Sequence, residues 1–236
     1  MAPIPVALVD HDCGLDRALL VDIAEMVTVV SQRELARPAP YGWGVGVSMR
    51  VAQSLTDVGP GEWPFALFSH PDVANALGYH NVSANGTPGL FAFPLIESDP
   101  DDLPVTVFHE IVEAAVDPPC ILSAVGDDGI VRALEPGDPV EADWWLYTCA
   151  SGRQLRVSNW VLPAWFGGCA GPLDHMGLCG HPGEIRPGGY VITYEPGKGW
   201  TEQFAGMKRA YRREVAAYGR TRKARRVAAH RSGAKS

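Results

Sequence analysis

The sequence predicts an α+β domain with a mixed sheet and short elements, followed by a basic tail. Hydrophobic residues make up 46% and charged residues 20% of the 236 residues, the profile of a globular protein with a buried core. The 26 glycines and 20 prolines are too many for a helical bundle and favour short elements joined by turns. The longest apolar runs, such as Ile111–Val116, fall far short of the roughly 18 residues of a membrane span. Membrane, fibrous and wholly disordered classes are therefore excluded.

The first half of the chain alternates between strand-like and helix-like patterns. Pro5–Val9 is expected to form a buried strand. Apolar residues then recur at helical spacing over Leu15–Leu35, with Asp12 or Asp16 as the cap and two following prolines as the stop. Further strands are expected at Gly44–Arg50, Trp63–Ser69 and Leu90–Ile96, with a tight turn bracketed by Gly78–Val82 and Gly86–Gly89.

The second half begins with the most apolar helix, over Pro104–Val116. Asp117-Pro118-Pro119 ends it, because proline cannot continue a helix. Short strands are expected over 121–150, around a hairpin turn at Gly126–Gly129. Later elements are a strand at Val157–Pro163, a final strand at Tyr190–Tyr194, and a helix from Trp200 onward. The predicted organisation is one domain over 1–200 and a basic helix or tail over 201–236.

The segment that carries chemistry is the His-Glu-x-x-Glu pattern in the apolar helix. His109 and Glu113 are four residues apart, so on a helix they share a face and can bind one metal ion. Glu110 follows His109, where a carboxylate could accept a proton from an activated water. This is the spacing of His-Glu-x-x-His zinc peptidases, with glutamate in place of the second histidine. Zinc accepts both nitrogen and carboxylate ligands.

The alternative is that Glu110 and Glu113 lie on a solvated stripe of the helix. The rest of the segment is apolar and belongs in a core, where carboxylates are costly unless they are paired or bind a metal. The third ligand must come from elsewhere, and the acidic segment about 25 residues downstream offers three candidates: Glu135, Asp138 and Glu141.

Several segments together resemble an uncharacterised family of phage and prophage proteins. They are Gly78-Tyr-His80, His109-Glu-x-x-Glu113-x-x-x-Asp117-Pro118, Asp138-Pro-Val-Glu141, the run Val157–Phe166, and Gly188-Gly-Tyr190. The likeness runs in order from about residue 15 to 226. The hallmark of the family is a Ser-His-Glu-Val-x-Glu-x-x-x-Asp-Pro helix, around which it is similar to zincin metallopeptidases.

The resemblance implies a zincin-like single domain with a buried His-Glu-x-x-Glu helix and one divalent metal, zinc or another. It implies His109 and Glu113 as metal ligands, Asp138 as the best third ligand, and Glu110 as the general base. Two positions depart from the family: Phe108 stands where serine is usual, and Gly137 stands where cysteine is frequent. Neither change removes a ligand.

Other histidines and cysteines are also candidate site residues. The cluster Cys169, His175, Cys179 and His181 could hold a second, structural zinc, although it lacks the close cysteine pairs of zinc knuckles and a thiol-bearing surface loop is the alternative. His80 could line the site, or be a turn histidine bonded to backbone. His11 is expected at the surface. The aromatic residues Trp144, Trp145, Trp160, Trp165 and Phe166 are expected in the core or in an interface.

Charge is distributed unevenly along the chain. The net charge is −7, yet residues 198–236 hold 12 of the 20 lysines and arginines and only two acids, Glu202 and Glu214. A basic tail of this kind could contact nucleic acid through its phosphates, or an acidic neighbour, or remain solvated. Tyr211 and Tyr218 are too few to form a stacking surface for bases.

Two functions follow as hypotheses. The first is a metal-dependent hydrolase of the metallopeptidase type that acts on a peptide or amide bond of a peptide or protein substrate. The second is a phage virion or assembly protein with a vestigial or structural metal site, bound to other virion subunits. The sequence shows no signal peptide, which predicts reduced cysteines and a location in the host cytoplasm or in the virion, with no membrane partner. An oligomer is compatible with either.

Overall fold

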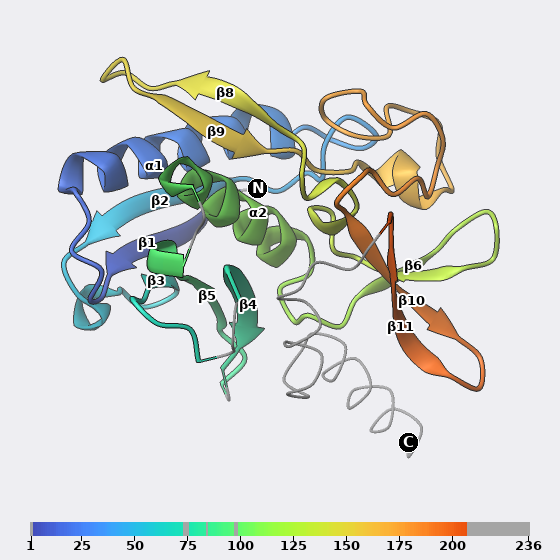
Figure 1. The fold of residues 1–236 in the computed structure, drawn as a ribbon, viewed down its shortest axis with the longest axis horizontal. Coiled ribbons are helices and arrows are strands. Elements are labelled where there is room, and N and C mark those ends of the chain that lie inside the picture. The colour runs from blue at the N-terminus through green and yellow to red at the C-terminus, as the bar shows by residue number, and fades with distance from the viewer. Residues whose placement is uncertain (1, 73–75, 84, 97–98, 207–236) are drawn as a thin grey trace.

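The expected α+β class is confirmed by the structure, a computed structural model that describes residues 2–72, 76–83, 85–96 and 99–206 (Figure 1). The five-stranded sheet A has the order β2 (Val47–Ala52), β1 (Ile4–Asp10), β3 (Trp63–Leu67), β5 (Pro88–Ala92), β4 (Gly78–Val82). Strands β2, β1, β3 and β5 are parallel, and the edge strand β4 is antiparallel to β5. The expected mixed sheet is therefore present.

Two helices pack on one face of sheet A: α1 (Arg17–Val30) and α2 (Leu103–Val116). Short helical turns are η1 (Ser31–Leu35), η2 (Leu55–Asp57), η3 (Pro94–Ile96), η4 (Pro100–Asp102), η5 (Asp138–Val140) and η6 (Pro163–Phe166). The second half of the chain forms sheet B, with the order β11 (Gly199–Phe204), β10 (Tyr190–Glu195), β7 (Val131–Ala133), β6 (Ser123–Val125), and a hairpin of β8 (Trp144–Thr148) and β9 (Gln154–Ser158).

Side-chain oxygens cap the start of helix α1 and, near its end, bind backbone N–H groups of strand β2. Asp16 caps its start by accepting a hydrogen bond from Ala18 N (3.0 Å). Near its end, Thr28 Oγ1 accepts from Met49 N (2.9 Å), and Ser31 Oγ accepts from Val47 N (3.0 Å). These hydroxyls satisfy the outer edge of strand β2 and hold the helix on the sheet. The expected single helix to Leu35 instead continues from Ser31 as a π-helical turn, η1.

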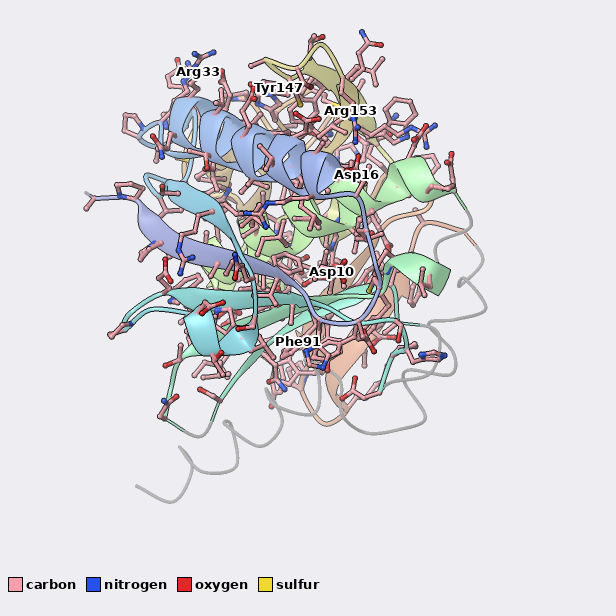
Figure 2. The ribbon with its side chains drawn as sticks, turned by 90° about the vertical axis from the view of Figure 1, so that its left-hand side faces the viewer. Asp10, Asp16, Arg33, Phe91, Tyr147 and Arg153 are labelled. Carbon is pink, nitrogen blue, oxygen red and sulfur yellow. The ribbon has the colours of Figure 1, made fainter. Side chains whose placement is uncertain are left out.

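The main core lies between sheet A, the two helices and the β8–β9 hairpin. In Figure 1 the hairpin lies over α1 and α2 on the side away from the sheet. It is attached to α1 by polar contacts, since Tyr147 Oη donates to Glu25 Oε1 (3.1 Å) and Arg153 lies 3.3 Å from Asp22. Figure 2 shows Tyr147 and Arg153 beside α1, and Phe91 on the opposite side of sheet A. Helix α2 is therefore enclosed from both sides.

Aromatic residues of the second half fill the core rather than form an exposed patch. Trp160 and Trp165 are fully buried, and Phe166 is nearly so. Trp160 packs beside Phe108 of α2, and Trp165 belongs to a second cluster with Val161 and Val191. The expected core role holds for these residues, whereas Trp144 is exposed on β8.

The helix expected from Trp200 is wrong at its start. Residues Gly199–Phe204 form strand β11, which pairs along its whole length with β10 in an antiparallel hairpin. Trp200 and Phe204 are spaced for one face of a strand and follow a Pro196-Gly197 turn, which is a strand pattern. Sheet B thus continues past residue 200. The rest of the tail, 207–236, lies outside the described residues.

Across the described ranges, the longest apolar helices stop well short of the length that a bilayer crossing needs.

An ion pair between strand β7 and the turn before it is buried on one side only. Arg132 donates two hydrogen bonds to Asp128, at 2.9 and 2.6 Å, and its guanidinium lies 5.7 Å from the centre of the Trp165 ring. The Arg132 side chain is 8% exposed, whereas that of Asp128 is 48% exposed. The hydrogen bonds from Arg132 hold the pKa of Asp128 at about 2, below its usual 3.8.

Removing this carboxylate is expected to destabilise the fold. Asp128→Ala leaves Arg132 without its partner, and we expect a loss of about 1–2 kcal/mol at pH 7, less than for a fully buried pair because water reaches Asp128. A carboxylate with a lowered pKa stabilises the fold above its unfolded pKa, near 4, and loses this contribution as the pH falls to about 2. Urea unfolding at pH 7 and pH 2.5 should therefore show a smaller difference between the variant and the wild type at low pH.

The control for this prediction is the exposed ion pair between Glu34, in η1, and Arg37, two residues after η1 ends. Glu34→Ala removes one carboxylate and one negative charge, as Asp128→Ala does, and should change the free energy of unfolding by less than about 0.5 kcal/mol. An equal effect of the two substitutions at pH 7 would contradict the assignment.

Candidate metal centre

Helix α2 positions the motif residues because its ends are fixed by sequence. Pro104 lies in its first turn, where a missing N–H costs nothing, and the chain leaves the helix at Asp117. Between these ends, His109 and Glu113 share a face one turn apart, with His109 Nε2 3.2 Å from Glu113 Oε1. Both side chains are buried, at 9% and 0% exposed. The solvated-stripe alternative is therefore wrong, because Glu110 is buried as well.

The residue that joins His109 and Glu113 as a third candidate ligand comes from η5. Asp138 Oδ1 lies 3.5 Å from His109 Nε2, and Asp138 is almost completely buried. Of the three downstream carboxylates, Asp138 is the one that joins His109 and Glu113 in a group whose ligand atoms all lie within 4.8 Å of one another. Glu135 is also buried, and Glu141 acts on His109 through its charge.

Gly137 explains how η5 comes so near the helix. A Cβ at this position would lie 2.6 Å from Nδ1 and 2.7 Å from Cε1 of His109, so only glycine fits against the imidazole. Any larger residue at this position would require the ring or the loop to move. Gly137 is thus tied directly to the position of His109.

Opposing effects act on the imidazole of His109. Burial lowers its pKa, but the hydrogen bond with Asp138 and the charges of Glu110, Asp138 and Glu141 outweigh burial and raise the pKa above its usual value. The surroundings of His109 are therefore strongly negative, and they favour a positive charge on or beside the ring.

His80 is the site residue that the sequence pattern left open. It lies in strand β4 rather than in a turn, and its buried side chain faces α2. His80 Nδ1 is 3.3 Å from Glu110 Oε2 and 3.8 Å from Glu113 Oε2. Together, His80, Glu110 and Glu113 form a second group with ligand atoms within 4.8 Å of one another. A strand containing polar residues at an edge gives little periodic signal, which is why its placement was not predicted.

Asp117, the acid that follows helix α2, shapes the chain after the helix. Its Oδ1 accepts hydrogen bonds from Ile121 N (3.0 Å) and Leu122 N (2.9 Å), and the side chain is fully buried. These bonds turn the chain sharply after α2 and direct it towards β6 and β7. The proline pair that follows prevents the helix from continuing.

The loop considered for a second zinc is organised around a carboxylate. Asp174 is buried and accepts hydrogen bonds from Asn159 Nδ2, Leu178 N and Cys179 N at 2.8–3.1 Å. His175 stacks on Trp160 with ring centres 4.2 Å apart, and burial raises the pKa of the Cys179 thiol to about 12. Within residues 2–206 as described, the groups that could hold a metal do not include this loop. His11 is exposed and lies beside Phe68.

Comparisons of the chain with protein-family models, with curated proteins and with solved structures find no match. The chemistry of the site therefore rests on its own donor atoms. His109, Glu113 and Asp138 supply one imidazole nitrogen and carboxylate oxygens, a set that binds divalent metal ions. His80 lies 3.3 Å from Glu110 and 3.8 Å from Glu113, so it adjoins this set through Glu113.

The close packing of Gly137 gives a direct test of the centre. Gly137→Ala is expected to push the His109 ring away from Glu113 and Asp138, and so to weaken Zn²⁺ binding by about 10–100-fold, as for loss of a residue that orients a ligand. The measurement is a competition titration with a chromophoric chelator. Gly180→Ala is the matched control, because its Cβ would meet nothing nearer than Glu184 Oε2 at 3.4 Å. Equal affinities in the two variants would count against a metal at His109.

Proposed function

We propose that this protein is a metal-dependent hydrolase of the metallopeptidase type, acting on a peptide or amide bond. The observation that carries the proposal is the convergence of His109, Glu113 and Asp138, all buried, beside the carboxylate of Glu110. The resemblance to the phage and prophage family with its zincin-like helix belongs to the same proposal.

The distances in the site suit a small divalent ion. Tetrahedral ligands bound to zinc at about 2.0–2.1 Å lie about 3.3–3.4 Å from one another. His109 Nε2 is 3.2 Å from Glu113 Oε1 and 3.5 Å from Asp138 Oδ1, on either side of this value. Side chains already held at these separations need little rearrangement to bind an ion. This supports zinc, or another divalent ion with similar ligands, as the cofactor.

The fold also supports the zincin-like part of the proposal. The motif helix α2 follows a mixed sheet and packs against β5 and the antiparallel edge strand β4. Consequently one side of the motif faces the sheet edge, where His80 lies, and the other side faces η5, where Asp138 lies.

In the proposed mechanism, His109, Glu113 and Asp138 hold the ion and Glu110 moves the proton. A bound zinc ion would supply Lewis acidity, which polarises a substrate carbonyl and lowers the pKa of water towards neutrality. Glu110 takes a proton from the attacking water and later returns it to the leaving amine. His80, 3.3 Å from Glu110 Oε2, orients that carboxylate. Two carboxylate ligands donate more charge than two imidazoles would, so we expect slow turnover.

The experiment that tests the proposal is hydrolysis of a peptide-library panel by the purified protein before and after metal removal. Chelation should abolish cleavage, and one equivalent of Zn²⁺ should restore it. Cleavage that persists without metal, or a protein that binds no divalent ion and cleaves nothing, would overturn the proposal.

The second candidate function is structural, as a phage virion or assembly protein. The observation that favours it is burial: the side chains of His109, Glu113 and Asp138 are at most 9% exposed, and structural metal sites are typically closed. A protein that retains a stoichiometric metal through chelation at moderate concentration, shows no cleavage and unfolds on metal loss would have this role.

A further inference from the structure

We propose that His80, Glu110 and Glu113 hold a second divalent cation, so that the protein has a two-metal centre with Glu113 as the shared carboxylate. The first position is the one formed by His109, Glu113 and Asp138. The second is formed by two elements, the edge strand β4 and the helix α2. This inference uses the first metal position of the proposed function, but it concerns binding and not hydrolysis.

The second group has its own nitrogen and its own oxygens. His80 Nδ1 lies 3.3 Å from Glu110 Oε2 and 3.8 Å from Glu113 Oε2, and all three side chains are buried. Either nitrogen of a neutral imidazole is a good metal ligand. Glu110 and Glu113 are three residues apart, so successive turns of α2 present both carboxylates to the same strand.

The close approach of β4 to α2 depends on another glycine. A Cβ at Gly78 would lie 2.7 Å from Thr106 Cγ2 and 3.2 Å from Glu110 Cγ. Because Gly78 has no side chain, the strand lies close enough to the helix for His80 to reach Glu110. Both metal positions are therefore built in the same manner, with a glycine that allows a ligand to approach α2, from β4 on one side and from η5 on the other.

The two oxygens of Glu113 face different groups. Oε1 lies 3.2 Å from His109 Nε2, in the first group, whereas Oε2 lies 3.8 Å from His80 Nδ1, in the second. A carboxylate placed in this way can bridge two ions, and bridged ions in two-metal sites are about 3.5–4 Å apart. The orientation of Glu113, rather than the number of acids, is the feature that indicates two positions.

Charge is compatible with a second ion. Glu110, Glu113 and Asp138 carry three negative charges when ionised, so one divalent ion leaves the group at −1 and two ions bring it to +1. Both values are moderate for a buried site, where uncompensated charge is costly. The donors are imidazole and carboxylate without thiolate, which suits Zn²⁺, Mn²⁺, Co²⁺ or Fe²⁺ rather than a soft ion such as Cu⁺.

Occupation of the second position would change what Glu110 can do. A carboxylate that is bound to a cation no longer accepts a proton readily near neutral pH. If the proposed function is correct, one ion therefore supports hydrolysis and the second ion inhibits it. Activity should rise with the first equivalent of metal and fall with the second.

The test counts bound ions and measures whether they interact. Metal-free protein carrying Cys169→Ser, which removes the exposed thiol, is equilibrated with Zn²⁺ and analysed by mass spectrometry; parallel samples are loaded with Mn²⁺ for electron paramagnetic resonance. We expect two ions per chain and an exchange-coupled Mn²⁺ signal. His80→Gln, Glu110→Gln and Asp138→Asn should each bind one ion, with an uncoupled signal. His70→Gln, a substitution of an exposed histidine, should bind two.

The outcomes separate the two metal proposals. One ion in the wild type, lost in Asp138→Asn but kept in His80→Gln, would overturn the second position and leave the first intact. One ion that is lost in His80→Gln and kept in Asp138→Asn would overturn the first position and the two-metal centre, and would leave only the second position. No bound ion would overturn both. Circular dichroism of each variant distinguishes loss of a ligand from loss of the fold.

Discussion

Glu110→Gln is expected to reduce kcat for peptide hydrolysis by about 10²–10⁴-fold, with one equivalent of Zn²⁺ still bound. The amide keeps the shape of the side chain but cannot accept a proton from water. Because His109, Glu113 and Asp138 are unchanged, the first metal position should retain its affinity. The measurement pairs steady-state kinetics on the best peptide of the panel with a metal count on the same sample.

The control for this substitution is Glu34→Gln, on the surface of η1. It removes the same charge at a distance from the site and should leave kcat within about twofold of the wild type. Unchanged kcat in Glu110→Gln would show that this carboxylate is not the base. Loss of the metal in Glu110→Gln at one equivalent would instead show that Glu110 belongs to the first position.

Zn²⁺ is expected to stabilise the wild-type protein markedly more than His109→Ala, which lacks a ligand of the first metal position. A ligand that binds only the folded state at a free concentration of 100 Kd adds about 2.7 kcal/mol to the free energy of unfolding. For a chain of this size we expect Tm to rise by about 5–10 °C. His109→Ala removes the nitrogen common to both close contacts of the first metal position, with Glu113 and with Asp138, so the part of this rise that comes from the first position should be lost.

Differential scanning calorimetry with and without Zn²⁺ measures this effect. His181→Ala is the matched control, since His181 is an exposed loop histidine that bonds to the carbonyl of Pro182, and its variant should keep the full rise. A similar rise in His109→Ala would mean that the stabilising ion binds elsewhere in the chain.

The helix that carries the motif is among the elements that the sequence predicts best. The expected bounds Pro104–Val116 differ from the observed Leu103–Val116 by one residue, because prolines mark both ends. The pairing of His109 with Glu113 follows from helical spacing alone. Local rules of this kind need no knowledge of the rest of the fold.

The remaining site residues depend on tertiary packing. Glu135, Asp138 and Glu141 are spaced three apart in a segment whose one regular element is the short turn η5, so no longer periodicity distinguishes them. Asp138 reaches His109 only because Gly137 packs against the ring. His80 is similar: its side chain meets α2 because β4 is antiparallel at the sheet edge and Gly78 allows the approach.

Strand β11 is a further difference from the expectation. A helix was predicted from Trp200 onward, whereas Gly199–Phe204 form a strand. The turn residues Pro196 and Gly197, between the runs that become β10 and β11, were the signal that could have found it.

The attachment of η5 has a consequence for how the protein unfolds. Arg186 N donates to Pro139 O (2.8 Å), and Gly189 lies against Pro139, so η5 is held by the segment leading into sheet B, while α2 belongs to the layer on sheet A. An ion between His109 and Asp138 would therefore join the two halves of the chain by closing a loop of about 29 residues. Amide hydrogen exchange should then show a single cooperative unit when metal is bound. In the metal-free protein, amides of sheet B should exchange through a separate, lower-energy opening.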